Sequence, residues 1–600
     1  MAKELGLRPS VSRTTTSPIK GFSVVPYYAK ETAEVAVGRV VGFRRLVGVS
    51  NGCIKRSVEA DQAFRVPLRA ATVRAALRGW CNRQHSRFWP CHWGFECSPP
   101  ELHPQSEAAG GGLVGPPPVS FAAHSAFRAP VVSVMETILV DAVSCLDTGP
   151  MSHRMVLIGF LQAQNCSTYP GSWRHPAASD DFMTAGYYQR VARTLEDARF
   201  DMAFFDDRLA MPEIYGASAD LAVEHGIRSV KINPTIVLMA IALATSHLGL
   251  GATYSTTYHE PYHVARLFQT LDQMTGGRAA WNIVTSLNDS EAANFGRELH
   301  LGHDERYDRA DEFVELVMKM WTSWDRDALI VDKTTGRFAD PAKVHPFASE
   351  GGYFNVHGTF TVPQSPQGHP VLLQAGASGR GQAFAGRWAE VVFGAYKNKQ
   401  SGMAQYKALK QAITDAGRDP SLVTIAPAVN VITAETPELV AEKRRLLLSL
   451  AKPEDSLALL CEVLNVDFST RPLDEPFSDA ELAGMSWQSL RDRVIKASGK
   501  QNPSVNDFVR HSGRGTLSEA PMFEGTPESV ADQLEDWFGD CCDGFVLMAG
   551  SVPGTYEDFA RLVVPILQRR GVVQSEYRGP TLRENLGLPL PSRPEATVGQ

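Results

Sequence analysis

Hydrophobic and polar positions alternate in a regular rhythm along the chain from Met155 onward. Short apolar runs rich in β-branched residues are separated by longer amphipathic segments. This rhythm is typical of parallel strands that are joined by helices. It predicts eight strands, at Val156–Leu161, Met202–Phe205, Leu248–Tyr254, Ala279–Thr285, Val371–Gln374, Glu390–Phe393, Val423–Val431 and Gly544–Met548.

Helices are predicted between these strands. The helix before the last strand begins with Thr526-Pro527-Glu528-Ser529, which combines an N-cap residue, a proline in the first turn and an acid near the positive helix end. Eight strand–helix units predict a TIM (β/α)8 barrel, whose chemistry lies on the loops after the strands. The predicted helices are Met183–Ala198, Glu260–Met274, Asp304–Trp321, Gly381–Trp388, Met403–Ala416 and Pro527–Gly539.

Two connections are too long for simple barrel loops. Residues 323–370 are rich in Gly, Pro and aromatic side chains and are compatible with a small hairpin, whereas residues 452–524 are polar and partly helical. Both lie between the end of one strand and the start of the next. Because long excursions in a compact domain usually serve a function, we expect these insertions to form a lid over the barrel mouth.

Residues 1–150 differ from the rest of the chain. They hold 17 Lys and Arg against 11 Asp and Glu, a net charge of +6. Because the whole chain carries −7, the remaining residues carry a net charge of −13. They also contain a run of three glycines and a run of three prolines. This composition predicts either a poorly ordered extension or a gene-model artefact with the true start near Met151. The barrel is then expected over 151–590, with a tail at 591–600.

The overall composition, 44% hydrophobic and 21% charged, is that of a globular protein, and the net charge of −7 argues against nucleic acid as a partner. The longest apolar stretch, Ile236–Leu250, is interrupted by Thr245, Ser246 and His247, so no membrane helix is predicted. The N-terminus lacks the pattern of a secretory signal. We therefore expect a cytoplasmic protein with reduced thiols.

Nine cysteines without regular spacing do not form a disulfide framework. Cys91 and Cys97 have His92 between them, and Cys81 and His85 lie nearby. Structural zinc sites usually have the C-x2-C spacing, which is missing here. We predict no metal site.

The residues at the strand ends carry the candidate chemistry. The second strand ends in Phe204-Phe205-Asp206-Asp207, the third in Thr253, and the fourth in Trp281-Asn282-Ile283-Val284-Thr285-Ser286. After the fifth strand, a Gly- and Ser-rich loop at 374–381 leads into a helix. Such a loop offers backbone N–H groups and a positive helix end to a phosphate, although it is also ordinary helix capping.

Several motifs resemble one known family, the nitrilotriacetate, dibenzothiophene-sulfone and pristinamycin-type monooxygenases of the bacterial-luciferase-like superfamily. Together they span the chain from Met155 to the 580s, and the Trp-Asn-Ile-Val-Thr-Ser block after Gly-Arg is the most specific of them. The motifs are Trp173-Arg174-His175-Pro176, the Phe-Phe-x-Asp ending at Asp207, Thr256-Thr257-Tyr258-His259-Glu260-Pro261-Tyr262, Gly277-Arg278-Ala279-Ala280-Trp281-Asn282-Ile283-Val284-Thr285-Ser286, His303-Asp304-Glu305-Arg306-Tyr307, and Gln374-Ala375-Gly376-Ala377-Ser378 with Gly381.

The resemblance implies reduced FMN as cofactor, supplied by a separate NAD(P)H-dependent flavin reductase. It also implies oxygenation of a small organic substrate by O2, with carbon–nitrogen or carbon–sulfur cleavage, in a homo-oligomer. Carried over by position, the expected flavin contacts are Asp207, Thr253, His303, Tyr307 and Ser378.

The resemblance also suggests that Asn282 lines the flavin pocket and that Trp281 or Trp173 lies near the ring or substrate. His175 and His303 are candidates for proton transfer, because imidazole titrates near neutrality, but no catalytic base is assigned.

Each of these residues also has a structural interpretation. Asp207 suits a helix N-cap or a partner for Arg208, and His303 with Tyr307 suits a solvated helix face. Asn282 suits a strand end with buried backbone to satisfy, and the two tryptophans suit the core.

One loop departs from the family pattern. Many members carry paired histidines after the first strand, whereas this chain reads Gln164-Asn165-Cys166-Ser167-Thr168-Tyr169-Pro170. We expect this loop to face the substrate. Two other functions fit the same barrel, a flavin- or deazaflavin-linked dehydrogenase and a catalytically silent binding protein.

Overall fold

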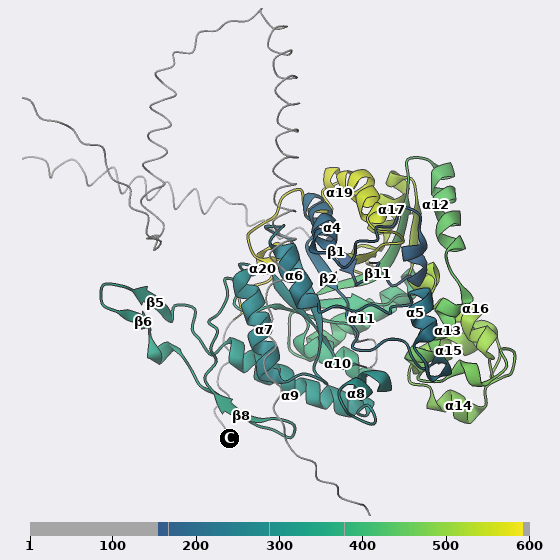
Figure 1. Ribbon diagram of the computed structural model, residues 1–600. Helices are drawn as coiled ribbons and strands as arrows, with labels where there is room; N and C mark the ends of the chain where they lie inside the picture. The colour runs from purple at the N-terminus through teal and green to yellow at the C-terminus, as the bar shows by residue number, and fades with distance from the viewer. Residues whose placement is uncertain (1–153, 166, 287, 377–378, 592–600) are drawn as a thin grey trace, which may run out of the picture. The chain divides into compact units, whose positions relative to one another are not determined.

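The structure is a computed structural model of the chain (Figure 1). It describes residues 154–165, 167–286, 288–376 and 379–591. The predicted N-terminal extension, with the cysteines and histidines at 81–97, lies outside the described residues, as does Ser378. None of the described helices has the length and apolar character needed to span a bilayer.

Eight parallel strands form a closed barrel, which confirms the predicted TIM fold. The ring runs β1–β2–β3–β4–β9–β10–β11–β13 and closes between β13 and β1. Every strand begins and ends within two residues of its predicted position. The strands are β1 (Val156–Leu161), β2 (Met202–Phe205), β3 (Gly249–Ser255), β4 (Ala279–Val284), β9 (Val371–Gln374), β10 (Val391–Gly394), β11 (Thr424–Thr433) and β13 (Gly544–Met548).

Alternate side chains of the strands fill the inside of the barrel. Val156, Ile158 and Phe160 of β1 belong to one apolar cluster with residues from strands across the ring. The ring of Phe160 lies 5.8 Å from that of Phe204 and 6.4 Å from that of Phe393. The interior is therefore a packed core, and ligands have access only at its ends.

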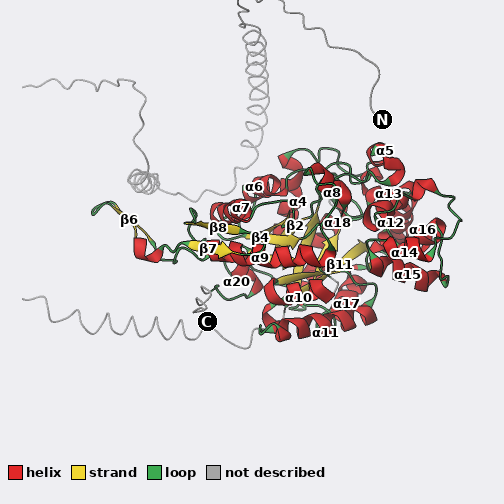
Figure 2. Cartoon of the chain, turned by 90° about the horizontal axis from the view of Figure 1, so that it is seen from below, coloured by secondary structure: helices red, strands yellow, loops and turns green. Residues whose placement is uncertain are grey.

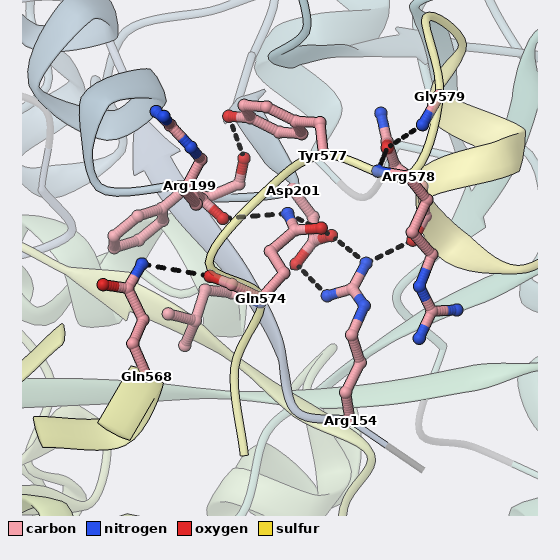
Figure 3. A network of polar contacts seen from close by, with 11 residues as sticks. Arg154, Arg199, Asp201, Gln568, Gln574, Tyr577, Arg578 and Gly579 are labelled. Carbon is pink, nitrogen blue, oxygen red and sulfur yellow. Dashed lines mark hydrogen bonds and ion pairs between the residues drawn. The ribbon is translucent and has the colours of Figure 1, made fainter. Parts of the chain in front are cut away.

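The C-terminal segment closes the amino-terminal end of the barrel. Leu582, on the short helix α20 (Leu582–Leu586), joins the interior cluster. It packs so closely on Gly249 that a Cβ there would lie 2.5 Å from its side chain. Beside it, Arg154 forms an ion pair with Asp201, and Gln574 also donates to that carboxylate (Figure 3). This end of the barrel is therefore sealed.

Helices surround the barrel, and local sequence explains their starts. In α4 the side chain of Thr184 accepts a hydrogen bond from Tyr187 N, and α17 begins at the predicted proline, Pro527. The surrounding helices are α4 (Ala185–Asp197), α6 (Pro234–Ala242), α7 (Pro261–Met274), α9 (His303–Trp321), α10 (Gly379–Trp388), α11 (Lys399–Asp415), α12 (Pro437–Ser449), α17 (Pro527–Trp537), α18 (Gly554–Asp558) and α19 (Val564–Arg569). Shorter elements in the loops are η1 (Pro170–Arg174), η2 (Tyr215–Ala217), α5 (Asp220–His225) and α8 (Asp289–Asn294).

The first insertion contains two hairpins. The hairpin of β7 (Phe347–Glu350) and β8 (Asn355–Gly358) lies against α9, where Glu312 accepts hydrogen bonds from the backbone of Tyr353 and Phe354. The hairpin of β5 (Leu329–Asp332) and β6 (Arg337–Ala339) projects away from the barrel (Figures 1 and 2). Only one hairpin was predicted here.

The second insertion is a small helical subdomain with its own apolar core. Its elements are α13 (Pro453–Leu464), α14 (Asp479–Gly484), α15 (Gln488–Ser498), α16 (Val505–Ser512) and β12 (Met522–Gly525), which pairs with the end of β11 outside the ring. Glu462 of α13 contacts Arg208, after β2, at 3.3 Å and accepts a hydrogen bond from Asn288, after β4, at 3.1 Å. The insertion therefore reaches over the carboxyl ends of these strands.

Candidate active site

Polar side chains from β3 and β4 meet at the carboxyl end of the barrel. Asn282 donates a hydrogen bond from Nδ2 to Thr253 Oγ1 at 3.0 Å, and both side chains are buried. One step further along the strands, Ser255 Oγ and Ser286 Oγ lie 3.0 Å apart. Active sites of TIM barrels are built at this end, because the strand ends converge there.

A small cavity of about 10 Å³ opens between these strand ends. This volume holds about one water molecule. Two predicted site residues, Asp207 and Thr253, face the same cavity. The lining residues are Asp207, Leu209, Thr253, Tyr254, Ser255, His259, Val284, Ser286 and Glu291.

Asp207 is an unusual carboxyl group. Burial raises its pKa to about 7, while Lys231 acts in the opposite direction. Burial in turn lowers the pKa of Lys231, whose Nζ lies 3.7 Å from Asp206 Oδ2. The mouth therefore holds a carboxyl group that gains and loses its proton near neutral pH, beside an ammonium group that is shielded from water.

We expect Asp207→Asn to remove a pH dependence of stability. Because the pKa of Asp207 is raised in the folded state, the folded protein binds a proton between about pH 4 and 7 that the unfolded chain has released. The free energy of unfolding therefore falls as the pH rises through this range. Because water and Lys231 screen the effect of the full pKa shift, we expect the protonation of Asp207 to contribute roughly 1–2 kcal/mol to the free energy of unfolding.

Urea unfolding at a series of pH values tests this expectation. The variant should lose the decline between pH 4 and 7 and should be more stable than the parent above pH 8. The exposed Asp304→Asn serves as control and should keep the parent's profile. An unchanged profile for Asp207→Asn would contradict the assignment.

Several buried polar atoms at this end have no hydrogen-bond partner among the described residues. They include Asn282 Oδ1, Gln162 Oε1 and Glu462 Oε2. Buried polar atoms are usually paired, so an unpaired group at a functional end indicates a ligand contact. Gln162 was missed from the sequence, although the inward alternation of Ile158 and Phe160 along β1 could have pointed to it.

The loop after β1 folds over the barrel interior. Thr168 Oγ1 lies 3.3 Å from Met548 Sδ, which belongs to the interior cluster. Asn165 Nδ2 donates to the backbone oxygen of Tyr169, and Gln164 Nε2 donates to that of Gly226. The loop that departs from the family pattern is thus held across the mouth by its own amide side chains.

His303 and Tyr307 form a second group, at the start of α9. Their rings lie 5.3 Å apart, and the ring of Tyr307 lies 5.6 Å from Phe384 of α10. Arg380 links the two helices more firmly, because it contacts Asp308 and Asp311 of α9 at 2.7 Å each. The start of α10 therefore lies beside the second and third turns of α9, and Ser378, outside the described residues, directly precedes α10 in the sequence.

Trp281, Trp173 and His175 lie outside both of these groups. Trp281 is fully buried in the layer between strands and helices, against Phe268 and Trp321, which agrees with its structural interpretation as a core residue. It points outward because its neighbour Asn282 points inward. Trp173 is partly exposed and donates to the backbone oxygen of His225.

His175 lines a different cavity, of about 220 Å³, between β11, α12 and α18. Burial lowers the pKa of His175, and Lys443 in the same cavity lowers it further. His175 and His303 therefore belong to separate places. Arg174, between Trp173 and His175, binds Asp455 of α13 through both guanidinium ends. Part of the Trp-Arg-His-Pro motif is thus a structural anchor.

Comparison with known proteins gives a consistent result. A model of the luciferase-like monooxygenase family matches residues 160–541. The chain is 45% identical to dibenzothiophene-sulfone monooxygenase of Rhodococcus erythropolis, over 73% of this chain and 97% of that protein. It is 37% identical to nitrilotriacetate monooxygenase component A of Aminobacter aminovorans, over 75% and 99%. The crystal structure of a riboflavin lyase with modified FMN and riboflavin matches at 34% identity with a TM-score of 0.66, over 72% and 96%.

Proposed function

Because the chain belongs to the luciferase-like monooxygenase family and is a flavin-dependent monooxygenase, we propose that it uses reduced FMN and O2 to oxygenate a small organic substrate with carbon–sulfur or carbon–nitrogen cleavage. The names of its relatives support these two bond classes, since one acts on a sulfone and the other on nitrilotriacetate, an amine. The observation that carries the proposal is the set of buried polar atoms at the barrel mouth that have no partner among the residues that the structure describes.

The polar group of β2 to β4 suits a flavin ring. The ring of reduced FMN presents N–H donors and carbonyl acceptors in one plane, and Asn282 Oδ1 is a buried acceptor without a partner among the described residues. We assign ring binding to Asn282, Thr253 and Asp207. When bound, reduced FMN supplies the electrons that activate oxygen.

The second group suits the phosphate. The starts of α9 and α10 each present backbone N–H groups and a positive helix end, and both features favour an anion. We assign phosphate binding to His303 and Tyr307 of α9 and to Ser378 before α10. His303 is also the better placed of the two candidate histidines for proton transfer, because His175 lines a separate cavity.

The helical insertion and the loop after β1 orient the substrate and exclude water. The insertion with Glu462 covers the mouth, and the loop with Thr168 crosses the interior beside Gln162. Exclusion of water strengthens polar contacts in the site and suppresses wasteful side reactions. We propose that this loop, which lacks the paired histidines of many relatives, sets the substrate range.

A separate NAD(P)H-dependent flavin reductase is the proposed partner. One relative is itself named component A of its monooxygenase, which supports a two-component system. Because the reductase uses NAD(P)H, we place the reaction in the cytoplasm. We also propose that the catalytic unit is 151–590 and that residues 1–150 are not needed for it.

Turnover assays test the reaction. The chain, a flavin reductase, FMN and 18O2 are combined with a panel of sulfones, sulfides and aminopolycarboxylates, and a chain starting at Met151 is assayed in parallel. We expect the label in the product with both chains. Substrate oxidation without label would indicate hydride transfer and would overturn the oxygenation.

Asn282→Leu tests the ring site. Leucine is similar in size to asparagine but has no amide group. A buried hydrogen bond to a ligand contributes about 1–3 kcal/mol to binding. We therefore expect the dissociation constant for reduced FMN to rise about tenfold to hundredfold in anaerobic fluorescence titration. Asn355→Leu, at an exposed position on β8, should leave it unchanged. If the parent protein does not bind reduced FMN, the proposed function is wrong.

A further inference from the structure

The cavity between β11, α12 and α18 is separate from the one at the strand ends. We call it the α12 cavity; its volume is about 220 Å³, and His175 is one of its lining residues. None of its lining residues lines the cavity at Asp207 and Thr253. Because a water molecule occupies about 30 Å³ in the liquid, this space takes a molecule as large as about seven waters. The α12 cavity is therefore large enough for a small organic ligand.

Three polar side chains that line the α12 cavity have a proton to donate. Thr433 is only 4% exposed, and its hydroxyl has no hydrogen-bond partner among the described residues. The backbone N–H of Ala177 donates to His175 Nδ1 at 3.1 Å, so the neutral imidazole carries its proton on Nε2. Burial and the nearby Lys443 both lower the pKa of His175, which favours this neutral form. Thr555 Oγ1 accepts from Ser551 N at 3.2 Å, so the hydroxyl proton of Thr555 is also left to donate.

The carboxylate at the α12 cavity is already engaged by cations. Lys443 Nζ donates to Asp558 Oδ2 at 2.5 Å and to the backbone oxygen of Thr433 at 3.0 Å. Arg561 Nη2 donates to the other oxygen of Asp558, Oδ1, at 3.2 Å. Because an ammonium group has three protons, Lys443 keeps one N–H beyond its two bonds. The cavity therefore has a surplus of donors, one of them charged, and a matching ligand supplies acceptor oxygens.

The remaining wall of the α12 cavity is largely apolar, since Ala177, Val431, Ile432 and Leu447 line the same space. Small-molecule sites typically combine such walls with a few polar groups at fixed positions. A carboxylate matches the surplus donors better than a neutral oxygen does, because hydrogen bonds with an ionised partner are about twice as strong. We propose that the α12 cavity binds a small carboxylate with an apolar body, at a site separate from the flavin site.

Isothermal titration of the full chain with small carboxylates tests the proposal. The probes are benzoate and hexanoate, each compared with a neutral compound of similar shape, benzyl alcohol and 1-hexanol. We expect at least one carboxylate to bind saturably and about tenfold or more tighter than its neutral match, because a hydrogen bond to a charged group contributes about that factor. Excess reduced FMN and the Asn282→Leu substitution should leave this affinity unchanged, since Asn282 does not line the α12 cavity.

Two variants locate the binding. Lys443→Met should raise the dissociation constant of the carboxylate about tenfold or more, and Thr433→Val should raise it about fivefold. Because the hydroxyl of Thr433 has no partner among the described residues, Thr433→Val should keep the parent's thermal unfolding midpoint, which separates lost binding from misfolding. Lys407→Met, at an exposed position on α11, is the matched control and should bind as the parent does.

Four results would overturn the proposal. The first is that neither carboxylate binds saturably to the parent, and the second is that the neutral compounds bind equally well. The third is carboxylate binding that tolerates both Lys443→Met and Thr433→Val. The fourth is competition between the carboxylate and reduced FMN, which would place the carboxylate in the flavin site.

Discussion

Arg174→Ala is expected to lower the free energy of unfolding by about 3–5 kcal/mol and to release the helical insertion from the barrel mouth. Arg174 donates to Asp455 Oδ2 at 2.7 Å and to Oδ1 at 2.8 Å, and the two side chains are 11% and 0% exposed. It also donates to the backbone oxygens of Leu450 and His225. Its removal leaves the carboxylate of Asp455 buried beside a cavity and without its counter-charge. An uncompensated buried charge strongly destabilises the folded state.

The consequence for activity follows from where Arg174 lies. It joins the loop after β1 to the first turn of α13, and the other end of α13 carries Glu462 at the mouth. We expect hydrogen exchange to rise in α13–α16 and oxygenation to fall, with substrate oxidation uncoupled from oxygen uptake because water enters the site.

Urea unfolding, hydrogen exchange and the ratio of product to oxygen consumed measure these effects. Arg174→Lys should be intermediate, because a lysine keeps the charge but not the two-pronged contact. The exposed pair of Arg190 and Asp181 provides the control, and Arg190→Ala should cost less than about 1 kcal/mol. Unchanged exchange in α13–α16 after Arg174→Ala would disprove the anchoring role.

Asp201→Ala is expected to have a similar cost, about 3–5 kcal/mol, at the opposite end of the barrel. Asp201 is 1% exposed and accepts hydrogen bonds from Arg154 through both guanidinium ends, from Leu157 N at 2.9 Å and from Gln574 Nε2 at 3.2 Å (Figure 3). These donors belong to the start of β1 and to the C-terminal segment. Without the carboxylate, the buried guanidinium of Arg154 loses its counter-charge and the seal of the barrel loosens.

The readout here is stability alone. Asp201→Ala should melt at a lower temperature, yet its specific activity at temperatures where it stays folded should equal the parent's, because the site lies at the other end. Asp201→Asn, which keeps the shape but not the charge, should be intermediate, and the exposed Asp197→Ala should be neutral. A loss of activity without a loss of stability would place Asp201 in the site and refute this assignment.

The positions of the strands could be predicted because each strand is buried on both faces. A strand that is buried on both faces must be apolar along its length, as β1 and β13 are. The helices of the second insertion were harder to predict from the sequence. Its core side chains, such as Phe468 and Phe508, pack on each other across loops, so no single run of residues shows the period of a long helix.

The candidate site was predictable in part for a similar reason. Asp207 and Thr253 were singled out because they follow or end strands, and converging strand ends bring them to one cavity. Gln162 was missed because it stands in a loop without a motif. The sequence left Trp281 either near the ring or in the core, because a motif shows which residues occur together but not to which face each one points; the structure buries it among core side chains.

By itself, the sequence determined the barrel, the family and the strand ends at which the site is built, because these depend on local periodicity and on short motifs. Only the tertiary structure decided which side chains meet. Arg174 and Asp455 stand 281 positions apart, and the pKa of Asp207 and the lining of the α12 cavity depend on the three-dimensional surroundings of each group. Burial and distance between remote residues arise when the chain closes on itself, and no local pattern encodes them.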